Sequence, residues 1–303
     1  MIQPFHFTKN IGRDFSSFYE KVINCNGVVC FDFEDSIHDD DERKLELLKV
    51  NHRFTIVENF KKLSSSILLD RIGFRINGAG TSYYHDDIKE LRKLQGVHCI
   101  FLPKVESAKQ VKNVFKDIPE VGIEIIPIIE TKSGFENMED ILSINNSRYL
   151  RIAFGHCDFN LSNHYFPFFH HDSEAYWEWI QHLSHHAKLK NKQLINSPVL
   201  NLKDAVFFSK VLSKNKFYEN ISGQITLCLN QTLLCVQSEL NSDLNFEFNI
   251  KNKSDNFEEA KRIIASFEKF KIADRFFAID ERGRLISPQE YQSAKMILNE
   301  IAV

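Results

Sequence analysis

The chain has 303 residues, of which 43% are hydrophobic and 26% are charged, and its formal net charge at pH 7 is −3. This composition is typical of a soluble globular protein with ample material for a core. The small net charge and the lack of a dense Lys/Arg cluster argue against a nucleic-acid-binding protein. No apolar run approaches the ~18 residues of a membrane span, and the N-terminal segment MIQPFHFTKN lacks the hydrophobic region of a signal peptide. We therefore expect a cytoplasmic protein with no membrane partner.

Short apolar segments alternate with longer amphipathic segments along most of the chain. The apolar segments are predicted to be strands, at 4–8, 28–33, 72–77, 98–105, 122–130, 149–155, 193–198 and 223–230. The segments between them are predicted to contain helices, at roughly 14–24, 40–62, 83–94, 107–118, 136–142, 174–190 and 202–213. Strands separated by such helices indicate βαβ units and a parallel sheet. Eight units favour an α/β fold of the (β/α)8 TIM-barrel type, and no GxGxxG motif supports a dinucleotide-binding fold.

The pattern changes after residue 240. The segment SDLNFEFNIKNKSDNFEE is polar and rich in Asn, which is typical of a linker. Two helices are predicted beyond it, at roughly 255–270 and 288–302. We therefore predict a barrel domain over residues 1–240 and a C-terminal helical extension over residues 241–303.

Polar residues recur at the carboxyl ends of five successive predicted strands. In a (β/α)8 barrel the active site lies at this end of the strands, so these residues are candidates for a site. In chain order they are Asp32-Phe33-Glu34-Asp35, Arg75-Ile76-Asn77, Pro103-Lys104-Val105-Glu106, Glu130-Thr131 and Gly155-His156-Cys157-Asp158.

These residues, in this order and spacing, resemble the citrate lyase beta-subunit-like branch of the HpcH/HpaI aldolase superfamily. The resemblance covers about residues 28–160, and a fainter one extends through the last two predicted helices. The segments that carry it are DFEDSI (32–37), RIN (75–77), PKVES (103–107), IET (129–131) and GHCDF (155–159).

The resemblance implies a Mg²⁺-dependent enzyme in which Glu130 and Asp158 hold the ion. Glu34 and Asp35 would lie near the ion and hold its waters. Arg75 would grip the carboxylate or carbonyl of the substrate, because a guanidinium group matches a planar carboxylate. Metal and arginine together would stabilise an enolate while a carbon–carbon bond beside a carbonyl is made or broken. The implied substrate is a 2-keto acid adduct or an acyl thioester, and the implied assembly is a homotrimer or homohexamer.

The sequence departs from the family pattern in its last third. Many members that act on acyl-CoA carry an aspartate where this chain has Ser287, and that acid reaches the site of a neighbouring subunit. In the motif of the eighth strand, Gln224 replaces a lysine and Cys228-Leu229-Asn230 replaces Ile-His-Pro. A serine cannot act as a carboxylate base at pH 7. These changes weaken the case for CoA thioester chemistry and favour a divergent substrate.

Three functional hypotheses follow. The first is a Mg²⁺-dependent carbon–carbon lyase or aldolase acting on a 2-keto acid or its adduct. The second is an enzyme that uses the same enolate site for a thioester or for a transfer reaction. The third is a divergent barrel that binds a small acid or a partner without turnover.

Other conspicuous residues have simpler interpretations. Lys104 is expected to be an internal charge partner, and the acidic run 39–42 is expected to be a solvated helix start. The His-rich segment 163–186 lacks a metal-ligand motif, so we expect its aromatic residues to pack in a lid or an oligomer contact. The six cysteines are spaced singly, which predicts reduced thiols rather than disulfides or a zinc site.

Overall fold

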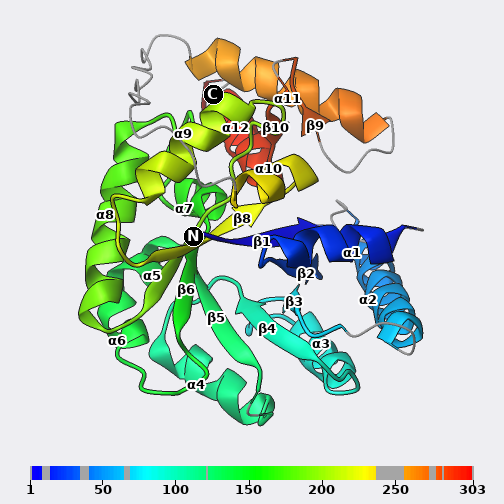
Figure 1. Cartoon of the computed structure of the whole chain (residues 1–303). Coiled ribbons are helices and arrows are strands. Elements are labelled where there is room, and N and C mark those ends of the chain that lie inside the picture. The colour runs from blue at the N-terminus through cyan, green and yellow to red at the C-terminus, as the bar shows by residue number, and fades with distance from the viewer. Residues whose placement is uncertain are drawn as a thin grey trace.

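A closed barrel of eight parallel strands forms the centre of the computed structural model (Figure 1). The structure describes residues 2–8, 14–34, 41–64, 69–120, 122–236, 256–272, 278–281 and 283–301. The strands pair in chain order, and β1 pairs with both β2 and β8, which closes the barrel and confirms the predicted fold. The strands are β1 Gln3–Thr8, β2 Val28–Asp32, β3 Ile72–Arg75, β4 Val97–Leu102, β5 Glu124–Ile129, β6 Arg151–Phe154, β7 Gln193–Asn196 and β8 Ile221–Thr226.

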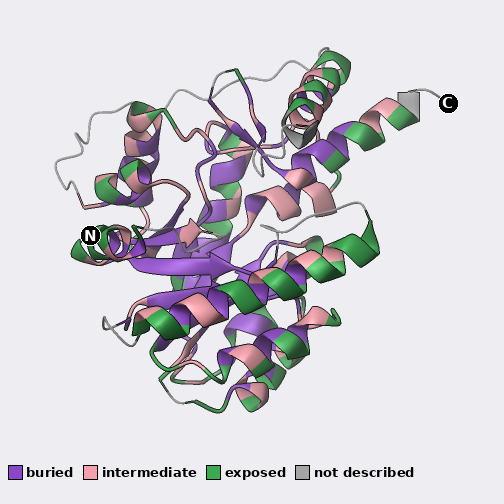
Figure 2. Ribbon diagram, turned by 90° about the vertical axis from the view of Figure 1, so that its right-hand side faces the viewer, coloured by how far each residue is buried: buried purple, intermediate pink, exposed green. Residues whose placement is uncertain are grey.

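Helices follow the strands and cover the outside of the barrel. Figure 2 shows that the strands are buried, whereas the helices turn exposed faces to solvent. The helices are α1 Phe15–Asn24, α2 Glu42–Ser64, α3 Tyr83–Leu91, α4 Ala108–Asp117, α5 Lys132–Glu136, α6 Met138–Leu142, α7 His156–Ser162, α8 Glu174–Leu189, α9 Ala205–Asn215, α10 Leu229–Leu234, α11 Asn256–Ile272 and α12 Pro288–Ile301. A short antiparallel hairpin, β9 Ala278–Ile279 and β10 Leu285–Ile286, lies between the last two.

The barrel interior is filled by alternate residues of the strands. Phe5, Cys30, Phe101 and Ile128 belong to one buried cluster, while intervening residues such as Phe31 belong to a second cluster. Because successive strand side chains point to opposite faces, the first cluster fills the barrel and the second lies under the helices. This alternation decides which residues at the strand ends point into the mouth of the barrel.

Three local elements differ from the sequence predictions. The sixth strand is followed at once by α7, so Asp158 lies in the first turn of a helix rather than at a strand end. The eighth strand ends at Thr226, and the predicted strand residues 228–230 instead lead into α10. Gln231 stabilises this turn, because its side chain accepts from the Leu227 N–H at 3.0 Å and donates to the Val199 carbonyl at 2.9 Å. The hairpin β9–β10 was also not predicted.

The C-terminal helices pack on each other and on the barrel. α11 and α12 contact each other extensively, and α12 also contacts α7. The N–H of Leu285 donates to the carbonyl of Leu200 at 2.9 Å, which ties the hairpin to the loop after β7. The predicted division at residue 240 lies outside the described residues, so it stays a prediction, as do the oligomer and the cytoplasmic location. Among the described residues, no helix is long and apolar enough to cross a membrane.

Candidate active site

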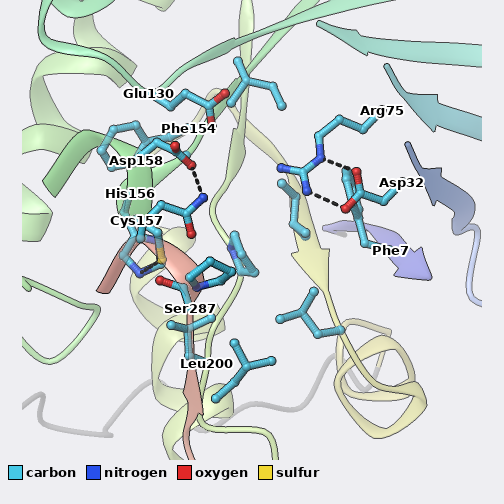
Figure 3. A pocket seen from close by; sticks show the side chains of 18 of the residues that line it. Phe7, Asp32, Arg75, Glu130, Phe154, His156, Cys157, Asp158, Leu200 and Ser287 are labelled. Carbon is cyan, nitrogen blue, oxygen red and sulfur yellow. Dashed lines mark hydrogen bonds and ion pairs between the residues drawn. The ribbon is translucent and has the colours of Figure 1, made fainter. Parts of the chain in front are cut away.

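The strand register carries three charged residues into the mouth of the barrel. Asp32 lies two residues after the interior Cys30, and Glu130 lies two residues after the interior Ile128. Asp32 also pairs in register with Arg75 on the neighbouring strand. Since alternate residues share a face, all three side chains point inward at the carboxyl end. They line one cavity of about 370 Å³ (Figure 3).

Arg75 is held in the mouth by two carboxylates. Its Nε and Nη2 donate to the two carboxylate oxygens of Asp32 at 2.8 and 2.6 Å, and its Nη1 lies 3.3 Å from Glu34 Oε2. Its guanidinium group also lies over the ring of Phe7, 5.6 Å from the centroid. A bidentate pair of this kind fixes the plane of the guanidinium group. The structure therefore presents Arg75 to the cavity in one orientation.

A buried polar network holds the turn that carries Glu34. The Lys49 ammonium group donates to the carbonyl of Glu34 at 3.1 Å and to Asn77 Oδ1 at 2.5 Å. The Asn77 side chain in turn donates to the carbonyl of Phe33 and to Asp87. The asparagine of the RIN segment therefore supports the backbone beside the site rather than lining the cavity.

Lys104 links three carboxylates of the site. Its ammonium group lies 2.6 Å from Glu34 Oε1 and 3.5 Å from Asp158 Oδ1. Its backbone has a φ of 51°, a left-handed conformation that costs a non-glycine residue roughly 1–3 kcal/mol. In this conformation its N–H donates to Glu130 Oε1 at 2.7 Å. Lys104 is a charge partner of these acids, as expected, but its side chain is 42% exposed rather than internal.

Glu130 is the most deeply buried acid of the site, with 2% of its surface exposed. Its carboxylate lies against Gly155, where an added Cβ would come within 2.2 Å of Glu130 Oε2. Burial, followed by the negative charges of Asp158 and Glu34, raises the pKa of the Glu130 carboxyl well above its usual value. A group of buried acids that repel one another is a typical setting for a cation or for acid–base chemistry.

Asp158 is bound by the C-terminal helix of the same chain. Gln289, in the first turn of α12, donates from its Nε2 to Asp158 Oδ2 at 2.9 Å. The neighbouring Ser287 is buried and lines the same cavity. In Figure 3 Asp158 and Glu130 lie on one side of the cavity, and Arg75 and Asp32 lie on the other. The tail thus completes the site of its own chain, whereas the family pattern had suggested contact with a neighbouring subunit.

The structure brings together four of the five predicted site residues. Arg75, Glu34, Glu130 and Asp158 are linked directly or through Lys104, while Asp35 lies outside the described residues. Asp32 was among the candidate residues at the strand ends but was given no role, and Gln289 was not predicted to belong to the site. The alternation along β2 could have identified Asp32, whereas no local pattern identifies Gln289. Within the described part of the chain, no group of three or more His, Cys, Asp and Glu side chains is arranged to hold a metal.

The His-rich segment packs beside the site. His156 Nε2 lies 3.0 Å from His170 Nδ1 and 3.7 Å from Cys157 Sγ. Arg284 Nη1 lies 3.0 Å from His170 Nε2 and 2.9 Å from Glu290, which joins the segment to the C-terminal extension. Burial lowers the pKa of His156 well below its usual value and raises that of the Cys157 thiol, so both groups are neutral. His170 of this segment is therefore held between His156 and Arg284.

The comparison with protein families agrees with the site. The model of the HpcH/HpaI aldolase/citrate lyase family matches residues 26–211, which is more than half of the chain. The chain belongs to this family. The match includes every strand end that carries the predicted site residues, and the predicted family is confirmed. A search of curated protein sequences found no match to this chain.

Solved structures resemble this HpcH/HpaI family member in fold. RipC from Yersinia pestis has a TM-score of 0.58 at 18% identity, with 78% of this chain and 93% of that chain covered. CitE from Mycobacterium tuberculosis, in complex with magnesium and pyruvate, has a TM-score of 0.60 at 17% identity, with 77% and 88% covered. CitE in complex with magnesium, acetoacetate and coenzyme A has a TM-score of 0.59 at 16% identity, with 99% and 97% covered. At these identities the likeness shows the fold alone.

Proposed function

We propose that the chain is a Mg²⁺-dependent carbon–carbon lyase or aldolase of the citrate lyase beta-subunit-like branch, acting on a 2-keto acid adduct. The single observation that carries the proposal is the arrangement of Glu130 and Asp158 opposite a fixed Arg75 in one cavity (Figure 3). A metal site and a guanidinium group on opposite sides of a pocket suit a substrate that develops negative charge between them. Family membership and the magnesium and pyruvate bound by the CitE structure support the same chemistry.

The residues present fit magnesium. Mg²⁺ prefers hard oxygen ligands and keeps several waters, so two carboxylates and the oxygens of a keto acid suffice. Glu130 and Asp158 would hold the ion, and Glu34 would lie near enough to hold its waters. The pocket that Gly155 leaves for the Glu130 carboxylate, and the mutual repulsion of these acids, are the structural observations behind this fit. When bound, Mg²⁺ supplies Lewis-acid stabilisation of a developing enolate oxygen.

The protein's own residues orient the substrate. Arg75 would bind the substrate carboxylate through its guanidinium group, with Asp32 fixing the plane of that group. Lys104 neutralises part of the negative charge of Glu34 and Asp158, so the pocket is not closed to an anionic substrate. Positioning of the reacting atoms by groups fixed in advance is a large part of enzymatic rate enhancement.

A keto acid adduct is favoured over a CoA thioester by the residues that depart from the family. Gln224 is fully buried, and its Nε2 donates to the carbonyls of Ser197 and Ile225, so it does not reach the cavity. Ser287 lines the cavity but supplies no carboxylate. Neither Gln224 nor Ser287 therefore provides a replacement group for thioester chemistry.

The proposal is tested by thermal unfolding with Mg²⁺ and each of pyruvate, oxaloacetate and glyoxylate. A ligand present at 100 times its Kd adds about 2.7 kcal/mol of stability, which raises the Tm of a chain of this size by about 5 °C. Glu130→Ala should abolish the shift, because it removes a metal ligand. Glu136→Ala removes an exposed acid of the neighbouring helix and should keep it. The absence of a shift in the wild type with all three acids, or a full shift in Glu130→Ala, would contradict the proposal.

A further inference from the structure

The cavity has a charged half and an apolar half. The charged half consists of the acids and Arg75 described above, carried by β2, β3, β5 and α7. The opposite half is carried by the loop after β7, the end of β8 and the C-terminal extension. Its apolar side chains are Leu200, Leu202, Ile225, Leu227, Phe267 and Leu285. These six side chains line the same cavity as the acids and Arg75, and we call them the apolar wall.

The described residues of the apolar wall offer no cation for a second anionic group. Among the described residues that line the cavity, Arg75 is the only one with a positive charge at neutral pH. Burial lowers the pKa of His6 to about 4, so its imidazole is neutral, and His156 Nε2 is engaged by His170 Nδ1 at 3.0 Å. A carboxylate or phosphate placed against the apolar wall would lose its hydration without a charge partner, which costs several kcal/mol.

The cavity is also larger than a small keto acid needs. If each of the six non-hydrogen atoms of pyruvate takes the roughly 30 Å³ of a molecule of liquid water, pyruvate fills about half of the 370 Å³. Carboxylate recognition at Arg75 places this head group in the charged half. The remaining volume is available to Mg²⁺ with its waters and to substrate atoms that contact the apolar side chains lining the same cavity.

Most of the apolar wall lies outside the part of the chain that matches the family. The family match ends at residue 211, whereas Ile225, Leu227, Phe267 and Leu285 come later in the chain. The charged half is contained within the matched segment. The charged residues of the cavity thus fall within the family match, whereas four of the six wall residues come after it in the chain.

We propose, on the basis of the function proposed above, that the apolar wall binds an uncharged hydrocarbon tail of the substrate. The substrate is then a 2-keto acid adduct with an alkyl or aryl group beyond the bond that is cleaved, and the second cleavage product is an uncharged carbonyl compound. A dicarboxylic adduct and a nucleotide-bearing thioester are disfavoured, because the described residues place no cation against the apolar wall to meet a second charged group.

The test is the affinity of a series of 2-keto acids measured with Mg²⁺ by calorimetry, with oxaloacetate prepared fresh because Mg²⁺ promotes its decarboxylation. Pyruvate, 2-oxobutyrate, 2-oxohexanoate and 2-oxooctanoate lengthen the tail, phenylpyruvate adds a ring, and oxaloacetate adds a charge. Each methylene group buried against the wall should lower the Kd by about fourfold. We expect 2-oxohexanoate to bind at least tenfold tighter than pyruvate, and oxaloacetate to bind no tighter than pyruvate. Tighter binding of the longer alkyl acids indicates an alkyl tail, and tighter binding of phenylpyruvate indicates an aryl tail.

Variants locate the effect in the cavity. Leu227 and Leu202 are both partly exposed, so Leu227→Asn and Leu202→Asn each place an amide in the wall at sites that are not closely packed. Either variant should reduce the ratio of pyruvate Kd to 2-oxohexanoate Kd to less than a third of the wild-type ratio. Leu233→Asn makes the same change at an exposed residue outside the cavity and should keep the ratio. If one wall variant fails to fold, the other still decides the outcome.

The possible failures are distinguishable. Equal affinity for pyruvate and its longer homologues, or tighter binding of oxaloacetate than of all the others, would overturn the hydrocarbon tail and leave the proposed function standing. Failure of every keto acid to bind in the presence of Mg²⁺ would overturn both.

Discussion

The contact between Gly155 and Glu130 allows a quantitative test of how the site is built. In Gly155→Ala the new Cβ would lie 2.2 Å from Glu130 Oε2 and 2.7 Å from Glu130 Cβ, far inside van der Waals contact. The backbone at Gly155 has a φ of −112° and a ψ of 84°, outside the left-handed region, so the cost comes from this clash. Overpacking of a buried position costs roughly 1–3 kcal/mol. We expect a loss of stability in that range together with weaker Mg²⁺ binding.

A double-mutant cycle identifies the source of this loss. Urea unfolding in EDTA gives the effect of Gly155→Ala in the wild type and in Glu130→Ala, where the clashing atoms beyond the Cβ are absent. In the second background the change should cost clearly less than in the wild type, because the overlaps with Oε2 and Cδ at 2.2 and 3.1 Å are removed while the one with Cβ at 2.7 Å remains. Gly80→Ala is the control, since nothing lies within 4 Å of a Cβ there, and it should stay within about 0.5 kcal/mol. An equal loss in both backgrounds would refute the packing argument.

Three further substitutions test the charges of the site and its support. Glu130→Gln keeps an acceptor for the Lys104 N–H but removes a buried acid. The free energy of unfolding in EDTA should therefore rise by about 1 kcal/mol or more, while the Mg²⁺-dependent thermal shift disappears. A destabilised variant would argue against repulsion among the acids. In Arg75→Lys the ammonium group cannot replace the planar guanidinium group that contacts Asp32 and the substrate carboxylate, so keto acid affinity measured by calorimetry should fall at least tenfold. Unchanged affinity would show that Arg75 does not bind the substrate. For Glu290, burial alone would raise the pKa, but His170 and Arg284 together lower it to about 2. The wild type should therefore lose stability as the pH falls from about 4.5 towards 2, because the unfolded chain binds the proton first. Glu290→Gln should be less stable at pH 7 by about 2 kcal/mol and should show a flatter urea midpoint over that pH range; an unchanged slope would contradict this assignment.

The barrel could be predicted from the sequence because its strands are short and almost continuously apolar. A strand such as Val28–Asp32 is buried along its whole length, which is the pattern of a parallel sheet covered on both faces. The helix after the sixth strand was missed because its first turn, His156-Cys157-Asp158, carries no apolar repeat. The helix start predicted at the acidic run is present, because α2 begins at Glu42 and Asp41 accepts hydrogen bonds from the N–H groups of Arg43 and Lys44.

The sequence predicts only those site residues whose positions follow from the pattern of neighbouring residues. Asp32 and Glu130 follow interior residues by two positions, so simple alternation along a strand places them in the mouth. Gln289 is 131 residues from the aspartate that it contacts, and no local pattern reports such a pairing. The same holds for Phe267 and Leu285, whose part in the cavity depends on how the C-terminal extension packs.

The hydrogen bond from Gln289 to Asp158 also links ligand binding in the cavity to the docking of the C-terminal helices on the barrel. A ligand that needs this contact binds only when α12 is docked, so binding and docking must stabilise each other by the same amount. At 100 times its Kd, such a ligand would strengthen the docked state by about 2.7 kcal/mol. Backbone amides of α11 and α12 would then exchange with deuterium about a hundredfold more slowly wherever exchange requires undocking. Hydrogen exchange of the C-terminal helices would therefore report whether the cavity holds a ligand, even when the reaction is unknown.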